Sequence, residues 1–330
     1  MAIHPFAAAA APGAPAGPSE APPAVGDREL GVDAPREPGW MPADQDPPAA
    51  PLARLRHNSR LAKRTVLTAS GVRGTAIEVA WLSTHVAMYP LGLAGEKFRD
   101  SRLQHTMDGM PLKHRGLLIN DIEAAGTPII LVHGVVDNRS VFALLKRGLR
   151  RRGFGRIITV NYSLLTDDIR AVAKRLADVV ESVVHETGYE RVHVVGHSMG
   201  GLIGRYYVQR MGGHDRVHTL VTLGSPHGGT LPATWVPHPI AKQMRPDSEI
   251  VAAFTQPAPQ CQTRILSIWS DLDLMIVPKV SARVVHPDLR ATNVFVRGVG
   301  HMSLPVDGRV VHEICTTLAH LDAEGHTVKL

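Results

Sequence analysis

The chain has little cysteine and few aromatic residues. It contains 2 cysteines, Cys261 and Cys315, in 330 residues, and aromatic residues make up only 5% of it. So few cysteines exclude a disulfide-rich scaffold, and we expect two free thiols in the core rather than a disulfide. No basic stripe interleaved with aromatic residues is present, so we expect no nucleic-acid partner. Hydrophobic residues make up 44% of the chain, enough for one large core.

Long hydrophobic runs are also missing. The apolar stretch 79–93 is interrupted by Pro90 and is too short to cross a bilayer. The first residues lack a basic region, and the alanine run 7–11 is too short and too weakly apolar for the core of a signal peptide. We therefore expect no Sec-type export signal and a protein that is cytoplasmic or peripherally associated with a membrane.

The first 52 residues differ in composition from the rest of the chain. They contain 12 prolines and 14 alanines, with no apolar periodicity. Such a segment cannot bury enough apolar surface to offset the entropy lost on ordering, so residues 1–52 are predicted to be a disordered tail.

The next segment, 53–125, combines a basic stretch with the apolar stretch 79–93. Residues 53–64 carry five basic side chains and no acid: Arg54, Arg56, Arg60, Lys63 and Arg64. Two interpretations are open. We favour a helix packed against the catalytic domain, and the alternative is contact of 53–93 with an anionic membrane surface. The sequence indicates no oligomeric state and no role for this segment.

From residue 126 to 330 the chain alternates between strand and helix patterns. Strands are predicted at 128–132, 156–162, 192–195, 217–223, 264–269 and 293–296, and helices at 139–151, 167–186, 201–211 and 309–321. Thr166 is the expected N-cap of the helix 167–186. Strands rich in valine and isoleucine that alternate with such helices indicate a parallel sheet covered on both faces, which is an α/β doubly wound fold.

The most specific motif is the sequence VHVVGHSMGG at 192–201, which places Ser198 at the centre of a G-x-S-x-G pattern. A short β-branched run leads into the motif, and a predicted helix follows it. The chain must therefore leave a strand and enter a helix in one sharp turn at the serine. The motif predicts that Ser198 is a nucleophile.

Two backbone amides are candidates for stabilising an oxyanion. The first predicted strand ends at His133-Gly134, and the amide of Val135 could point at a developing negative charge. Met199 begins the helix after Ser198, so its amide has no partner inside that helix. In a parallel sheet both loops lie at the carboxyl ends of the strands, where we expect the site.

A serine nucleophile needs a general base, and His301 is the predicted one among 18 histidines. It follows the last predicted strand in a tight loop that contains Gly298 and Gly300. The other candidates lie in less suitable places: His286 in a connecting loop, His312 and His320 on the last predicted helix, and His227 in another loop after a strand. We therefore expect His301 to accept the proton of Ser198.

The base needs an acid to orient its ring, and two carboxylates compete for this role. Both Asp271 and Asp273 follow the strand 264–269. Asp273 is favoured because it directly precedes the apolar segment 274–278, while Asp271 is the alternative; either could simply cap a turn. The resulting order of serine, acid and histidine is that of α/β-hydrolases.

Residues 128–321 resemble bacterial triacylglycerol lipases and esterases of the α/β-hydrolase superfamily, particularly compact ones with little cap structure. The likeness rests on LVHG at 131–134, GHSMGG at 196–201, LGSPHGGT at 223–230, and SDLDLMIVP with GVGHMSLP at 270–278 and 298–305. The resemblance implies Ser198 as the nucleophile, His301 as the base, Asp273 as the acid, and the amides of Val135 and Met199 as the oxyanion hole.

This resemblance implies hydrolysis of a lipid or small ester through an acyl-enzyme on Ser198, without a cofactor or a metal. An acyltransferase or a thioesterase with the same three residues is the alternative. The connection 232–257 is expected to form a small lid, although its apolar side chains suit ordinary core packing equally well.

Overall fold

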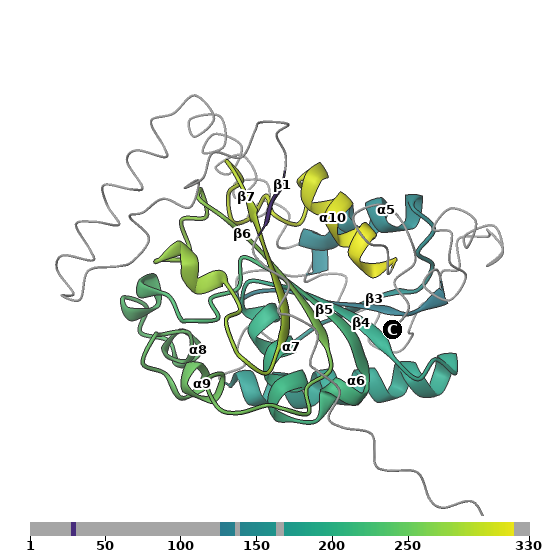
Figure 1. Cartoon of the computed structure of the whole chain (residues 1–330), viewed down its shortest axis with the longest axis horizontal. Coiled ribbons are helices and arrows are strands. Elements are labelled where there is room, and N and C mark those ends of the chain that lie inside the picture. Colours follow the sequence, from purple (N-terminus) through teal and green to yellow (C-terminus); the bar gives the residue numbers. More distant parts are fainter. Residues whose placement is uncertain (1–27, 31–125, 136–138, 163–167, 320–330) are drawn as a thin grey trace, which may run out of the picture.

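The structure is a computed structural model that describes residues 28–30, 126–135, 139–162 and 168–319. These residues form a parallel sheet of 7 strands in the order β1-β7-β6-β5-β4-β2-β3 (Figure 1). The strands are β1 (Arg28–Leu30), β2 (Ile129–Val132), β3 (Ile157–Val160), β4 (Val192–His197), β5 (Val217–Leu223), β6 (Arg264–Ser270) and β7 (Arg290–Val296).

Helices cover both faces of this sheet. The α-helices are α5 (Ala143–Arg151), α6 (Ile169–Thr187), α7 (Met199–Arg210), α8 (Pro239–Gln243), α9 (Glu249–Ala253) and α10 (Gly308–Leu318). Short 3₁₀ turns are η2 (Arg139–Phe142), η3 (Gly213–Asp215), η4 (Leu231–Thr234) and η5 (Lys279–Ala282). Helices α5 and α10 lie on one face, and α6 and α7 on the other (Figure 1).

The core is divided by the sheet into two layers, because successive side chains of a strand point to opposite faces. In β2, Ile130 and Val132 join the apolar cluster that contains residues of α6 and α7. Ile129 and Leu131 join the cluster that contains residues of α5 and α10. All four side chains are fully buried. The expected parallel sheet covered on both faces is confirmed.

Helix α6 (Ile169–Thr187) begins two residues later than the sequence predicts. Its N-cap is Asp168, whose side chain accepts a hydrogen bond of 2.8 Å from the backbone N–H of Arg170. The expectation that Thr166 caps this helix is wrong, since the aspartate is a strong capping residue and lies next to the first helical residue. Thr166 itself lies outside the described residues.

Strand β1 comes from the segment that was expected to be disordered. Leu30 pairs in parallel with Val296 of β7. Arg28 forms an ion pair with Glu313 of α10, and Glu29 lies 3.4 Å from the guanidinium of Arg297. For these three residues the structure differs from the expectation. The rest of 1–52 and the whole of 53–125 lie outside the described residues.

The direction of the connections reverses between the neighbouring strands β2 and β4. Strands β3 and β4 flank β2 on its two sides. The chain runs from β2 through α5 to β3, and from β3 through α6 to β4. Connections that leave in opposite directions from neighbouring strands open a crevice at the carboxyl ends of these strands, where ligands bind in such sheets. The loops that begin at His133 and at Ser198 start at this point.

The connection 232–257, expected to be a small lid, packs largely against the core. Ile240, Ile250 and Phe254 are buried in the cluster of α6 and α7. Arg205 and Gln209 of α7 donate hydrogen bonds of 3.2 and 3.1 Å to the carbonyl of Phe254. Core packing therefore accounts for much of its apolar character, and a lid role for 232–257 stays a prediction.

Candidate active site

Ser198 stands in a strained turn between β4 and α7. Its φ is 55° and its ψ is −124°, and among the described residues it is the only non-glycine residue with a positive φ. A side chain is held in this region only when the surroundings impose it, and such strain is typical of functional sites. The sharp strand-to-helix turn predicted from the G-x-S-x-G motif is confirmed in its backbone geometry.

Gly200 explains why the motif needs a glycine after the serine. A Cβ atom at this position would lie 2.0 Å from the carbonyl oxygen of Val132 and 2.7 Å from that of His133. The first turn of α7 therefore packs directly on the backbone that leads to Val135. This contact brings the segments of the two candidate oxyanion donors, the amides of Val135 and Met199, next to each other.

Asp273 and His301 are in direct contact. The Oδ2 atom of Asp273 lies 2.8 Å from Nδ1 of His301, and the two side chains are only 2% and 5% exposed. Oδ1 of Asp273 accepts hydrogen bonds from the backbone N–H groups of Met275 and Ile276, at 3.0 and 3.2 Å. The acid thus holds the ring at Nδ1, so that Nε2 is the nitrogen that could exchange a proton with a nucleophile.

The end of β5 joins this pair to Ser198. The backbone N–H of Ser198 donates a 2.9 Å hydrogen bond to the carbonyl of Leu223. The next residue is Gly224, at which a Cβ atom would lie 2.6 Å from Oδ2 of Asp273 and 3.1 Å from Nδ1 of His301. The carboxyl ends of four strands therefore meet at one place.

The surroundings of Asp273 favour its ionised form. Burial alone would raise the pKa of this carboxyl. The charge and hydrogen bond of His301 oppose this effect, as do the charge of Lys279 and the N–H of Met275, and the net pKa is lowered. A carboxylate that stays charged stabilises the imidazolium form of a neighbouring histidine.

Asp271 has a different role in the same loop. Its Oδ1 atom accepts a 2.7 Å hydrogen bond from the backbone N–H of Gly298 and lies 3.3 Å from the hydroxyl of Ser270. Asp271 thereby ties the loop after β6 to the loop after β7. This contact holds the loops that carry Asp273 and His301 together.

The other candidate histidines lie elsewhere. The Nε2 atom of His227 is 3.0 Å from the hydroxyl of Thr222, and burial, with a smaller effect of the Arg205 charge, lowers its pKa well below the ordinary value. His286 contacts the carbonyl of Gln256 at 3.1 Å, and His312 lies on the exposed side of α10. His320 lies outside the described residues.

Several residues around the Asp273–His301 pair are not predicted by the sequence. The Nε2 atom of His197 lies 3.0 Å from the carbonyl of His301, and Lys279 donates a hydrogen bond from Nζ to the carbonyl of Asp273. Tyr162 contacts the backbone of His133. Only Tyr162 carries a usable signal, because it is the last residue of the predicted strand 156–162 and so lies at the same edge of the sheet.

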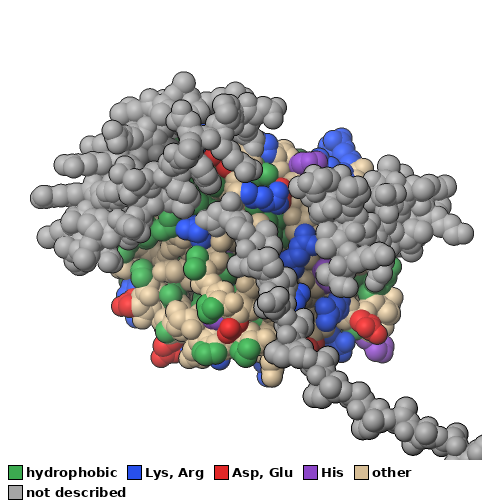
Figure 2. All heavy atoms as spheres, viewed as in Figure 1, with side chains coloured by type: hydrophobic (Ala, Val, Ile, Leu, Met, Phe, Trp, Pro, Cys, Tyr) green, Lys and Arg blue, Asp and Glu red, His purple; other side chains and the backbone are tan. Residues whose placement is uncertain are grey.

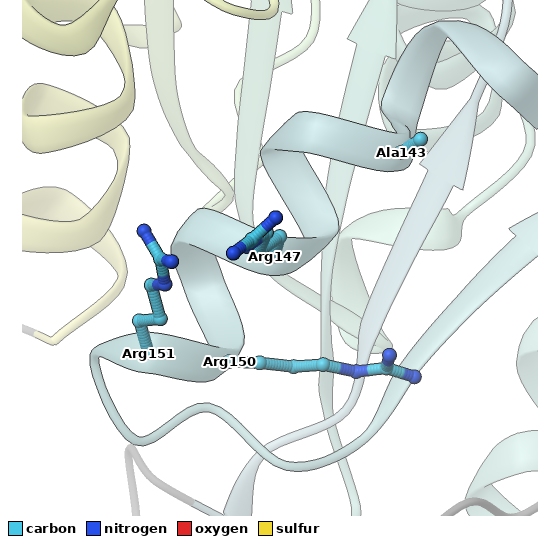
Figure 3. A pocket seen from close by; sticks show the side chains of 4 residues that line it. All are labelled: Ala143, Arg147, Arg150 and Arg151. Atoms are coloured by element: carbon cyan, nitrogen blue, oxygen red, sulfur yellow. The ribbon is translucent and has the colours of Figure 1, made fainter.

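A separate basic hollow lies on α5. It has a volume of about 470 Å³ and is lined by Ala143, Arg147, Arg150 and Arg151. The side chains of Arg147 and Arg151 point to one side of the helix and that of Arg150 points away from them (Figure 3). None of the candidate site residues lines this hollow.

The described part of the chain contains neither a metal-binding cluster nor a membrane-spanning helix. There, no group of three or more histidine, cysteine or acidic side chains could hold a metal ion. In the same residues no helix is both long enough and apolar enough to cross a membrane. Both cysteines, Cys261 and Cys315, are buried and are not joined in a disulfide.

A serine in a strained strand-to-helix turn, with a buried aspartate–histidine pair after later strands of a parallel sheet, defines the α/β-hydrolase fold class. Residues 128–283 of this chain match the palmitoyl protein thioesterase family. The mature form of the Bacillus licheniformis lipase BlEst2 is similar in structure, with a TM-score of 0.51 and 16% identity over 59% of this chain and 92% of that chain.

Two further proteins are similar in sequence. The GPI inositol-deacylase of Candida albicans is 26% identical over 144 residues, which are 43% of this chain and 31% of that protein. The sn-1-specific diacylglycerol lipase ABHD11 of Xenopus laevis is 28% identical over 129 residues, which are 38% of this chain and 40% of that protein. The chain thus spans well under half the length of each relative. The expected α/β-hydrolase fold, with lipases among its relatives, is confirmed.

Proposed function

We propose that the protein is a serine carboxylic ester hydrolase of the lipase and esterase type. The observation that carries this proposal is the 2.8 Å contact between Asp273 and Nδ1 of His301, at the same edge of the sheet as the strained Ser198. A base oriented by a buried carboxylate, at the same sheet edge as a partly exposed serine, is the arrangement that activates a hydroxyl for acyl transfer. The names of the relatives, a deacylase and a lipase, support this activity.

The reaction we propose proceeds in two halves. Oγ of Ser198 attacks the ester carbonyl carbon and gives its proton to Nε2 of His301, and the carbonyl oxygen becomes an oxyanion that accepts hydrogen bonds from the amides of Val135 and Met199. The C–O bond then breaks, and His301 returns the proton to the leaving alcohol. Water attacks the acyl-enzyme in the same way and releases the acid. No cofactor takes part in these steps.

The substrate we propose is a lipid-like ester. The exposed apolar side chains Trp235, Val236, Leu274 and Met275 are between 46% and 71% exposed. They belong to two segments that are hydrogen-bonded to each other, since Thr230 donates to the carbonyl of Met275 at 2.8 Å. Hydrophobic side chains also reach the surface over the part of the molecule that α8 and α9 occupy (Figure 2). Apolar surface beside Asp273 suits an acyl chain.

A series of p-nitrophenyl esters from two to sixteen carbons tests this proposal. We expect kcat/KM to rise with chain length beyond two carbons, because each further methylene group buries apolar surface.

The thioesterase alternative has support of its own in the family match at 128–283. It is tested with thioesters that carry the same acyl chains. Higher kcat/KM for the thioesters would favour that alternative, and turnover of no substrate in either series would contradict both.

As the alternative to a helix packed against the catalytic domain, we propose contact of the segment 53–93 with an anionic membrane surface. Charge reversal of Arg54, Arg56, Arg60 and Lys63 tests this alternative. In the full chain, this variant should no longer sediment with phosphatidylglycerol vesicles, because the charge attraction to the lipid is removed. Truncation is unsuitable, since it would also remove β1. A matched variant reverses Arg147 and Arg151 of the exposed α5 surface. Loss of sedimentation in this variant alone would assign the contact to α5 instead.

A further inference from the structure

Tyr162 lies just after β3 and packs on the loop that carries Val135. Its side chain is buried, with 5% exposure. Its ring stacks on the ring of His133, with 4.2 Å between the ring centroids and an interplanar angle of 9°. Its hydroxyl donates a hydrogen bond to the carbonyl of His133 and lies 3.4 Å from the carbonyl oxygen of Gly134.

The side chain of His133 contacts the same loop. It is 1% exposed, and its Nδ1 atom lies 2.9 Å from the carbonyl oxygen of Gly134. The carbonyl of the Gly134–Val135 peptide is therefore contacted by the side chains of both Tyr162 and His133. In a trans peptide the C=O and N–H groups point in opposite directions. Fixing this carbonyl thus fixes the direction of the Val135 N–H.

The opposite side of this loop is fixed by α7. The carbonyls of Val132 and His133 lie against Gly200, where no Cβ atom could be accommodated. The carbonyl of His133, to which the Tyr162 hydroxyl donates, therefore also lies against the first turn of α7. A phenylalanine would fill the same space, so packing alone does not explain the hydroxyl. The hydroxyl contacts the two carbonyls that precede the candidate oxyanion donor.

We propose that Tyr162 is a positioning residue that, together with His133, directs the Val135 N–H toward the oxyanion of the tetrahedral intermediate. This inference rests on the proposed ester hydrolase function. The benefit of such a donor is realised only when negative charge develops, so it stabilises the transition state more than the bound substrate. Loss of the Tyr162 hydroxyl should therefore lower kcat and leave KM nearly unchanged.

The test compares Tyr162→Phe with the wild-type chain on a p-nitrophenyl ester. Removing an oxyanion donor itself costs about 10²- to 10³-fold in kcat, so loss of a group that only orients the donor should cost about 10-fold. KM should change less than about twofold, since the ground-state contacts remain. The affinity for a trifluoromethyl ketone, which forms a tetrahedral adduct with the serine, should fall by the same factor as kcat.

Titration with an organophosphonate normalises each rate to the number of reactive serines, so partial unfolding of a variant cannot imitate the effect. The matched control is Tyr207→Phe, which removes the hydroxyl of another buried tyrosine, on α7. His133→Phe retains an aromatic ring but removes the Nδ1 contact, and it should lower kcat in the same way.

The outcomes separate this inference from the proposed function. If the wild-type chain neither hydrolyses an ester nor reacts with the phosphonate, the proposed function fails. If the wild-type chain is active and Tyr162→Phe keeps its kcat per titrated serine, only the positioning role is overturned. A fall in kcat with an equal fall in KM would also overturn it, because that result points to altered substrate binding rather than transition-state stabilisation.

Discussion

Replacing Ser198 with alanine is expected to reduce kcat/KM for p-nitrophenyl esters by about 10⁴-fold or more, because the acyl-enzyme can no longer form. Residual hydrolysis would come from the oxyanion donors and from binding alone. The variant should still fold, because alanine bears the same backbone strain at this positive φ as serine does. Initial rates at substrate concentrations above and below KM measure the effect.

The matched control for this variant is Ser182→Ala, which removes a hydroxyl from the exposed side of α6. Its kcat/KM should equal that of the wild-type chain. Retention of full activity by Ser198→Ala would show that the hydrolysis depends on a different nucleophile. Failure of the wild-type protein to form an adduct at Ser198 with an organophosphonate would lead to the same conclusion.

Replacing Asp273 with asparagine is expected to lower kcat by about 10³- to 10⁴-fold, because the amide neither fixes the tautomer of His301 nor stabilises its charged form. Asp271→Asn is the matched control, two residues earlier in the same loop. The Asp271 side chain accepts a hydrogen bond from the N–H of Gly298, which an amide oxygen can also accept. We therefore expect Asp271→Asn to retain most of its kcat; the reverse result would exchange the roles of the two aspartates.

The pH dependence of stability provides a second measurement on the same variant. Because the pKa of Asp273 is lowered in the folded chain, its carboxylate contributes stability above the ordinary pKa and loses this contribution as the pH falls through the lowered value. Asparagine does not titrate. The carboxylate's contribution to the difference in free energy of unfolding between the wild-type chain and Asp273→Asn should therefore be lost below about pH 4.

Much of the fold could be predicted because its signals are local. The buried strands are short β-branched runs, and β5 has the bounds that the sequence indicated, Val217–Leu223. The position of Ser198 could also be predicted, since the glycine after it and the following helix are adjacent in the chain. His301 was selected by its place after the last strand, and the structure brings it to Asp273.

The remaining features depend on contacts between distant segments. The hydrogen bond from Gly298 to Asp271 joins residues 27 positions apart, so the sequence alone could not assign different contacts to Asp271 and Asp273. Tyr162 and His133 are separated by 29 positions, and their stacking follows from the pairing of β2 with β3. The N-cap of α6 was misplaced because Thr166 and Asp168 are both good capping residues and lie close together.

Strand β1 has a consequence for the solubility of shortened forms of the protein. It consists of only three residues, Arg28–Leu30, and it lies at the end of the sheet beside β7. Without it, the backbone N–H and C=O groups of β7 would form an exposed edge, which is a template for pairing with a second molecule. We therefore expect forms of the protein that lack β1 to be more prone to edge-to-edge aggregation.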